Sequence, residues 1–201
     1  MGFFDIFRRE PAVATAGDLA DFLDRQAAFL GQKGIFEYSR ARAGPYGNVL
    51  FDDKVFLAEV ENARWFAFPV ALAMVAEAVE GVLRQAAPER REAVLHGVTA
   101  AALAVFDRYP RPAAVDAETW AEKRRDLVHD LALIGLHAVK RAMDVPARFV
   151  DRYVEAMPIH EKLRAKDVPT IHNYLKANLC NIHEVFVRRA NVAALVEEIA
   201  V

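Results

Sequence analysis

The stretch that decides the fold is 52-DDKVFLAEVENARWFAFPVALAMVAEAVEGVLRQ-85. It is dominated by residues with good helix propensity and predicts a helix from near Asp52 to about Gln85. Pro69 lies within this run and has no backbone N–H to donate to the preceding turn. We therefore expect a kink or a split close to Phe68.

Helical signals continue on the N-terminal side of this run. Apolar residues recur at spacings of three, four and seven from Asp18 to about Ala43, which predicts one helix. Gly31 and Gly34 within it indicate either a break or a close approach to another helix. The segment 43–48, AGPYGN, combines proline, glycine and asparagine and predicts a turn.

Further helices are predicted on the C-terminal side. They run from Pro88 to about Arg108, from Asp116 to about Met143, from Asp144 with an interruption at Pro158, and from Asp167 onward, with Asn191 dividing off a short terminal helix. The run 131–139, LALIGLHAV, is apolar on every side, so we expect it in the middle of the protein.

The pattern as a whole predicts an all-α fold. No segment alternates with a period of two and no repeat of 20 to 50 residues is present, which disfavours a sheet and a solenoid. We expect a compact bundle of about six or seven helices, some kinked at Pro69 and Pro158. Residues 17–201 are predicted to form a single helical domain behind an N-terminal stub and linker, residues 1–16.

Composition excludes several classes of function. The formal net charge is -2 and the arginine doublets are scattered, so nucleic acid is not an expected partner. Only one cysteine is present, which fits a reducing, cytoplasmic location, and the Ala- and Arg-rich composition suggests a bacterial source. No run approaches the ~18 uninterrupted apolar residues of a membrane span, so peripheral contact is the most that we expect.

The N-terminus carries a short amphipathic hook. Phe3, Phe4, Ile6 and Phe7 precede two arginines and a linker of small residues. The hook can dock on its own domain, on a protein partner or on a lipid surface, although ten residues bury too little to hold a membrane alone. Deleting residues 1–9 is predicted to leave the fold intact and to weaken association.

The common catalytic and cofactor motifs are absent. Ser39 is the only serine and lacks a nucleophile elbow, so we expect a small polar residue on a helix surface. Neither a P-loop nor a dinucleotide-binding glycine motif occurs. No zinc or di-iron motif is present either, so no metal and no cofactor is predicted.

One local group has the ingredients of an activated nucleophile. His183 and Glu184 follow Cys180 by three and four residues, which places them on one helical face. A hydrolase or transferase using Cys180 and His183 is therefore one hypothesis. The alternative, which we favour, is that Cys180 is a small structural side chain, because neighbours on one helix seldom point at each other.

A second group suggests a ligand pocket. His137 is the one imidazole inside an apolar run, and a buried imidazole needs a hydrogen-bond partner. Ten of the thirteen phenylalanines lie within the first 68 residues. Phe22, Phe29, Phe36 and Trp65 could join His137 around a small apolar or acyl ligand, or they could simply fill the core.

These observations give three hypotheses for function. The leading one is a non-catalytic helical binding or adaptor protein, which engages a protein partner or its own copy through the aromatic N-terminal third and the hook. The alternatives are a helical carrier of a small apolar or acyl ligand and the Cys180 enzyme. Fold class alone cannot choose among them, because helical bundles host unrelated functions.

Overall fold

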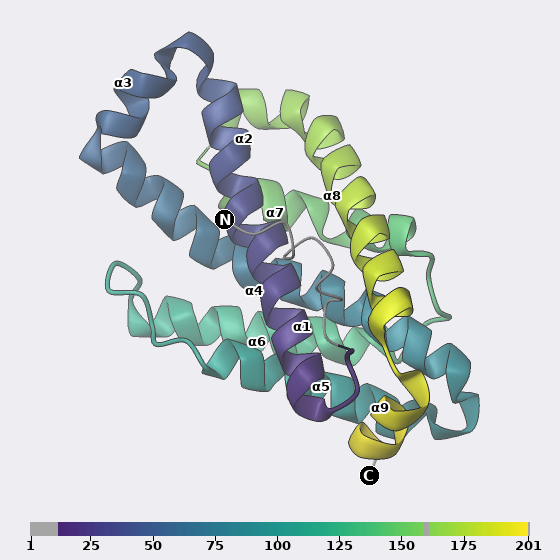
Figure 1. The fold of residues 1–201 in the computed structure, drawn as a ribbon. Helices are drawn as coiled ribbons and strands as arrows, with labels where there is room; N and C mark the ends of the chain where they lie inside the picture. The colour runs from purple at the N-terminus through teal and green to yellow at the C-terminus, as the bar shows by residue number, and fades with distance from the viewer. Residues whose placement is uncertain (1–11, 159–160, 201) are drawn as a thin grey trace, which may run out of the picture.

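The computed structural model describes residues 12–158 and 161–200, and this part of the chain is all-α, as predicted (Figure 1). Its longer elements are α1 (Ala16–Ala28), α2 (Gly34–Ala43), α3 (Gly47–Asp52), α4 (Lys54–Ala86), α5 (Arg91–Asp107), α6 (Ala117–Ile134), α7 (Val150–Ala156), α8 (Glu161–Arg189) and α9 (Val192–Ile199). Short 3-10 turns lie at Gly44–Tyr46, Pro88–Arg90 and Ala142–Arg148, and a π-helical turn at Phe29–Lys33. No strand occurs within the described ranges.

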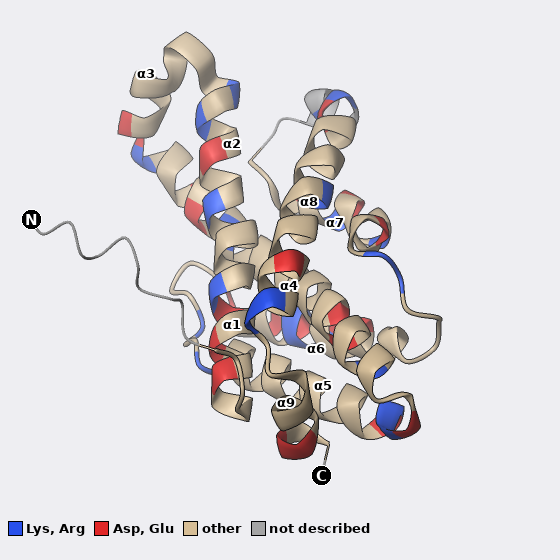
Figure 2. Ribbon diagram, turned by 45° about the vertical axis from the view of Figure 1, so that its right-hand side comes forward, with Lys and Arg blue, Asp and Glu red and all other residues tan. Residues whose placement is uncertain are grey.

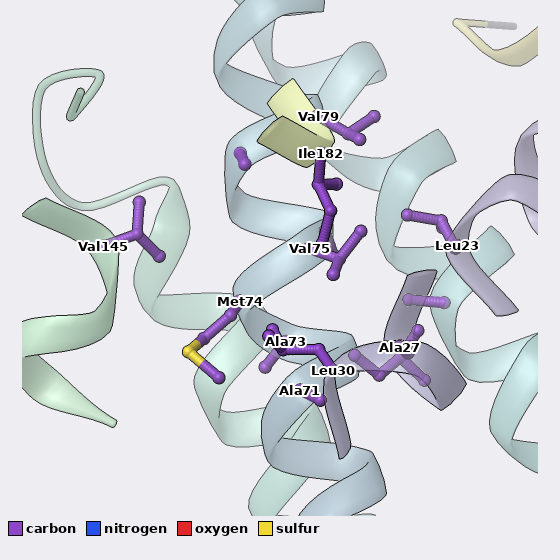
Figure 3. Packing of buried hydrophobic residues seen from close by; sticks show 14 of the residues in the cluster. Leu23, Ala27, Leu30, Ala71, Ala73, Met74, Val75, Val79, Val145 and Ile182 are labelled. Carbon is purple, nitrogen blue, oxygen red and sulfur yellow. The ribbon is translucent and has the colours of Figure 1, made fainter. Parts of the chain in front are cut away.

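Helix α4 forms the centre of the bundle. Asp53 caps its start, where the carboxylate accepts the backbone N–H of Val55 at 2.7 Å. The helix continues through Pro69, so of the two predicted alternatives, a kink or a split near Phe68, the split does not occur. Its buried side chains meet those of the surrounding helices in one continuous hydrophobic cluster, part of which Figure 3 shows around Ala71, Met74, Val75 and Val79.

The same helix passes a composition test for membrane spans. Lys54–Ala86 has a window of mean hydropathy 1.8, and 89% of that window is buried inside the protein. A core helix of this length needs apolar residues on most sides, because other helices surround it.

The two glycines of the first helical segment mark a close approach. The chain runs from α1 through the π-helical turn into α2 without a break. A Cβ on Gly31 would lie 3.1 Å from the Cα of Phe68, and one on Gly34 would lie 2.7 Å from the Tyr174 hydroxyl. Of the two alternatives, a close approach is therefore the one that occurs, and glycine is required there because any side chain would collide with α4 or α8.

The predicted turn at 43–48 is present, and Gly44 has a positive φ of 54°. Asp116 caps α6 as expected, and Asn191 caps α9 by accepting the N–H of Ala194.

Val13, which we assigned to the linker, is buried and exchanges backbone hydrogen bonds with Arg189 and Asn191. The ordered fold therefore begins before residue 17.

The end of α6 differs from the prediction. The helix stops at Ile134 rather than near Met143, and Leu136 is 79% exposed. The expectation that 131–139 lies in the middle of the bundle is wrong for its second half. Gly135 weakens the helix at this point, and beyond it Lys140 leaves the helical path to reach Glu77 on α4.

The last long helix also begins earlier than predicted. Helix α7 ends at Ala156, just before Pro158, so the expected interruption is confirmed. Helix α8 then starts at Glu161 and contains Pro169 in its interior, whereas we expected Asp167 to cap it. Asp167 is instead buried and accepts a hydrogen bond from Arg42 on α2 at 3.1 Å.

Candidate binding surfaces

The residues predicted to surround an apolar ligand do not meet around one cavity. Phe22 is fully buried, with its ring 5.1 Å from that of Phe186. Trp65 packs edge-on against Phe68 on α4, Tyr109 just after α5 and Trp120 on α6. Phe29 and Phe36 are 37% and 36% exposed, so they contribute to the surface instead.

His137 belongs to the segment between α6 and α7. Its Nδ1 lies 2.9 Å from the carbonyl oxygen of Ala138, and its Nε2 lies 3.5 Å from a carboxylate oxygen of Glu77. The Lys140 ammonium is 3.2 Å from the same Nε2. His137 lines none of three surface hollows on the described part of the chain, and the groups nearest its Nε2 are the charged side chains of Glu77 and Lys140.

Those charged groups form a buried ionic network that the sequence analysis did not foresee. Glu77 accepts Lys140 at 2.9 Å and Arg148 at 2.7 Å, although its side chain is only 3% exposed. Arg148 also contacts Asp130 at 3.3 Å, and Arg152 donates to both oxygens of Asp130 at 2.8 Å. The network therefore ties the segment 135–152 to α4 and α6.

Glu80, one turn after Glu77, is the least satisfied of the buried acids. Its side chain is inaccessible to solvent, and Oε1 lies 3.0 Å from Nε of Arg84 without the alignment of a hydrogen bond. Burial raises the pKa of Glu80 to about 7, outweighing the opposing attraction of Arg84. Two glutamates in an apolar run were the sequence signal for this cluster. Glu80 pairs with Arg84 one turn on, but the partners of Glu77 lie 63 and 71 residues away.

Cys180, His183 and Glu184 line one shallow hollow of 380 Å³, facing Lys140 and Arg141. Cys180 is partly buried. Among the described residues, no hydrogen bond joins the thiol to the imidazole. The lysine and the arginine are held by Glu77 and Asp144, so the hollow contains the predicted side chains but no assembled pair.

Ser39 is buried on α2 rather than exposed, and its hydroxyl has no hydrogen-bond partner among the described residues. The hook residues Phe3, Phe4, Ile6 and Phe7 lie outside the described residues. Over the described part of the chain, no group of three or more His, Cys, Asp or Glu side chains is placed to hold a metal ion.

The most exposed apolar surface lies on a hairpin formed by α2, α3 and the start of α4, residues 34–57. It projects past the rest of the bundle at the top of Figures 1 and 2. Rings of Phe36, Phe51 and Phe56 hold its helices together at centroid distances of 5.2 and 5.3 Å. Because these rings face one another, the hairpin has a small core of its own.

The tip of this hairpin presents large apolar side chains to solvent. Tyr46 is 72% exposed, Val49 71% and Val55 73%, and we call these three residues the apolar tip. Residues 43–51 contain no charged side chain, so the end of the hairpin is tan in Figure 2. Five of the ten exposed large hydrophobics in the described residues lie on the hairpin, so exposed apolar surface is concentrated there.

Charges of both signs flank the apolar tip. Arg40 is exposed on α2, while Asp52, Asp53 and Lys54 are exposed where α3 meets α4. A twofold axis between two such hairpins can bring a basic side chain of one copy opposite an acidic side chain of the other. Both signs of charge that such a symmetric contact would pair are therefore present around the apolar tip.

Comparison with known proteins gives no relative from which a function could be transferred. No protein-family model, no curated protein and no solved structure matches this chain.

Proposed function

We propose that this protein is a non-catalytic helical binding protein that associates with a second copy of itself through the apolar tip of the α2–α4 hairpin. The exposure of Tyr46 and Val49 at the uncharged end of a projecting element, with exposed Val55 nearby at the start of α4, carries the proposal. Burying such side chains contributes about 25 cal/mol per Å² of apolar surface, which favours a covered state.

The hairpin has the size that an interface needs. Stable interfaces use about 20–30 residues on each side, with apolar and aromatic side chains at the centre and polar ones at the rim. The exposed part of residues 34–57 has this kind of composition, since Tyr46 and Val49 lie in the chain between Arg40 and the Asp52–Lys54 charges, and Val55 follows those charges directly.

Sedimentation equilibrium tests the proposal. The wild-type chain should show a monomer–dimer equilibrium across the micromolar range. The triple variant Y46S/V49S/V55S should raise the dimer dissociation constant at least about tenfold, because truncating one hot-spot residue at the centre of an interface costs about 2 kcal/mol or more. Helical circular dichroism should stay at the wild-type level, since the three side chains already face solvent.

A matched control separates the tip from surface hydrophobicity in general. The double variant L136S/V187S removes two side chains that are 79% and 51% exposed elsewhere on the bundle, and it should dimerise like wild type. Deleting residues 1–9 measures how much the N-terminal hook contributes to the affinity of the dimer. A wild-type chain that stays monomeric throughout, or an equal loss in the control, would overturn the proposal.

A further inference from the structure

Residues 135–141, between α6 and the 3-10 turn at Ala142–Arg148, lie outside any helix and pack against α4. We call them the connecting segment. A Cβ on Gly81 of α4 would lie 2.9 Å from a methyl carbon of Val139, so the two surfaces touch closely. Lys140 of the segment binds Glu77 of α4 at 2.9 Å. The segment is therefore attached to α4 by an apolar contact and by charged groups.

Arg84 joins the backbone of the connecting segment to an acid on α4. Its Nη1 donates a hydrogen bond to the carbonyl oxygen of His137 at 3.1 Å, and its Nε lies 3.0 Å from Oε1 of Glu80. One guanidinium thus stands between a carbonyl group of the segment and a carboxyl group of the helix. Any change in its attraction to Glu80 also affects its hold on the segment.

Glu80 is fully buried, and neither of its carboxyl oxygens has a hydrogen-bond partner among the described residues. A carboxyl in this position favours its neutral form, because the ionised form requires hydrogen bonds or a well-aligned counter-ion. Burial accordingly raises the pKa of Glu80 to about 7. The neutral and ionised forms therefore exchange in the range where most proteins work.

The surroundings of Glu80 determine which group responds when it ionises. Every neighbouring element contributes a charged or titratable group around Glu80 and Glu77: Arg84 on α4, Arg91 at the start of α5, Asp130 on α6, and His137, Lys140 and Arg148 from the chain between α6 and α7. Glu77 repels the ionised form of Glu80. Lys140 and Arg148 are both bound to Glu77, so Arg84 is the cation placed to respond.

We propose that Glu80 and Arg84 form a pH-sensitive latch on the connecting segment. While Glu80 is protonated, Arg84 holds the carbonyl group of His137 and the segment stays closed on α4. When Glu80 loses its proton to solvent, its carboxylate competes for the guanidinium, which binds a carboxylate more strongly than a neutral carbonyl oxygen. The buried charge is also relieved when water enters beneath the segment. Both changes release residues 135–141 from α4.

The latch is separate from the apolar tip, so it holds or fails independently of self-association. Opening would also widen the hollow that the segment forms with Cys180 and His183, because Val139, Lys140 and Arg141 make up one of its walls.

Limited proteolysis of the full chain with lysyl endopeptidase tests the latch. Cleavage after Lys140 reports opening, because this ammonium must leave Glu77 to enter the protease, and a dilute protease measures the open population. Dividing the rate by that of E80Q at the same pH removes the pH dependence of the protease itself. From pH 6 to pH 8 this ratio should rise about tenfold, as expected when opening returns a carboxyl of pKa about 7 to its ordinary value of 4.5.

Three controls separate the latch from other causes. Cleavage after Lys54, exposed at the start of α4, should give the same ratio at both pH values, which excludes global unfolding. The variant E92Q, at an exposed glutamate on α5, should be cleaved like wild type. The variant R84M loses the hydrogen bond to the His137 carbonyl and should be cleaved after Lys140 at least about fivefold faster than wild type at pH 6.

Three results would overturn the proposal: a ratio that stays constant from pH 6 to pH 8, an equal rise at Lys54, or R84M cleaved as slowly as wild type. Because the imidazole of His137 also titrates in this range, a pH dependence that E80Q retains in full would assign the opening to His137 instead. Circular dichroism of E80Q and R84M confirms that a changed rate does not reflect unfolding.

Discussion

Replacing Glu80 by glutamine should make the stability of the protein less sensitive to pH. In the folded protein this carboxyl is fully buried, and burial raises its pKa from 4.5 to about 7. The folded state therefore binds a proton between pH 4.5 and 7 that the unfolded chain releases. Stability from this group is greatest below pH 4.5 and falls as the pH rises to 7.

The size of the effect follows from the two pKa values. At about 1.4 kcal/mol for each pH unit, moving the pKa from 4.5 to about 7 corresponds to about 3 kcal/mol. The attraction of Arg84 is already contained in this value, since it opposes the larger effect of burial. Glutamine resembles the protonated acid in shape, so E80Q should gain about 3 kcal/mol over wild type between pH 5 and 8.

Urea unfolding followed by circular dichroism at pH 5, 6, 7 and 8 measures this difference directly. Other groups titrate in both proteins and cancel from the comparison. The variant E92Q, with its exposed site, should show no such trend. Parallel stability curves for wild type and E80Q would refute the reasoning, and so would a difference that shrinks as the pH rises.

The remaining predictions concern packing, charge and capping. Gly31→Val should lower the unfolding free energy by about 1–3 kcal/mol through collision with the backbone of α4, whereas Gly47→Ala, with no atom closer than 3.9 Å, should not destabilise. Arg148→Met leaves two buried carboxylates short of a partner and should cost about 3–5 kcal/mol in urea unfolding. Thr15→Ala removes the cap of α1 and should cost about 1 kcal/mol, visible as a lower Tm.

Local signals predicted most of the helical fold. The caps at Asp116 and Asn191, the turn with Gly44 and the stop before Pro158 each depend on residues within a few positions of one another. Such short-range chemistry is visible in a single sequence. The close approach at Gly31 was also signalled, because glycine inside a helix usually has a packing reason.

The errors came from long-range ion pairs. The helical spacing of apolar residues predicted that α6 continues to about Met143. In the structure, Lys140 instead binds Glu77, which lies 63 residues earlier. Asp167 looked like a helix cap, yet it is bound to Arg42, 125 residues away. Neither ion pair can be predicted from the local spacing of apolar residues. Both ion pairs outweigh the helix preference of that spacing, because an unpaired buried charge costs several kcal/mol.

The candidate surfaces could be predicted only in part from the sequence. Residues 43–48 were predicted as a turn, but the projection of this turn at the end of a hairpin was not predicted. The aromatic residues of the N-terminal third were correctly singled out as unusual, while their division between core and surface depends on the path of α2 against α4. Phe22 lies on the inner side of that path and Phe36 on the outer.

The contact at Gly31 has a mechanical consequence. The π-helical turn Phe29–Lys33 interrupts regular α-helical bonding at the base of α2, and Pro69 removes a hydrogen bond from α4. Because Gly31 touches Phe68, both interruptions lie at the same level, and we expect any bending of the hairpin against the bundle to occur there. From Lys54 to Pro69 the lever arm is about 22 Å, so a rotation of about 10° would carry the apolar tip through about 4 Å.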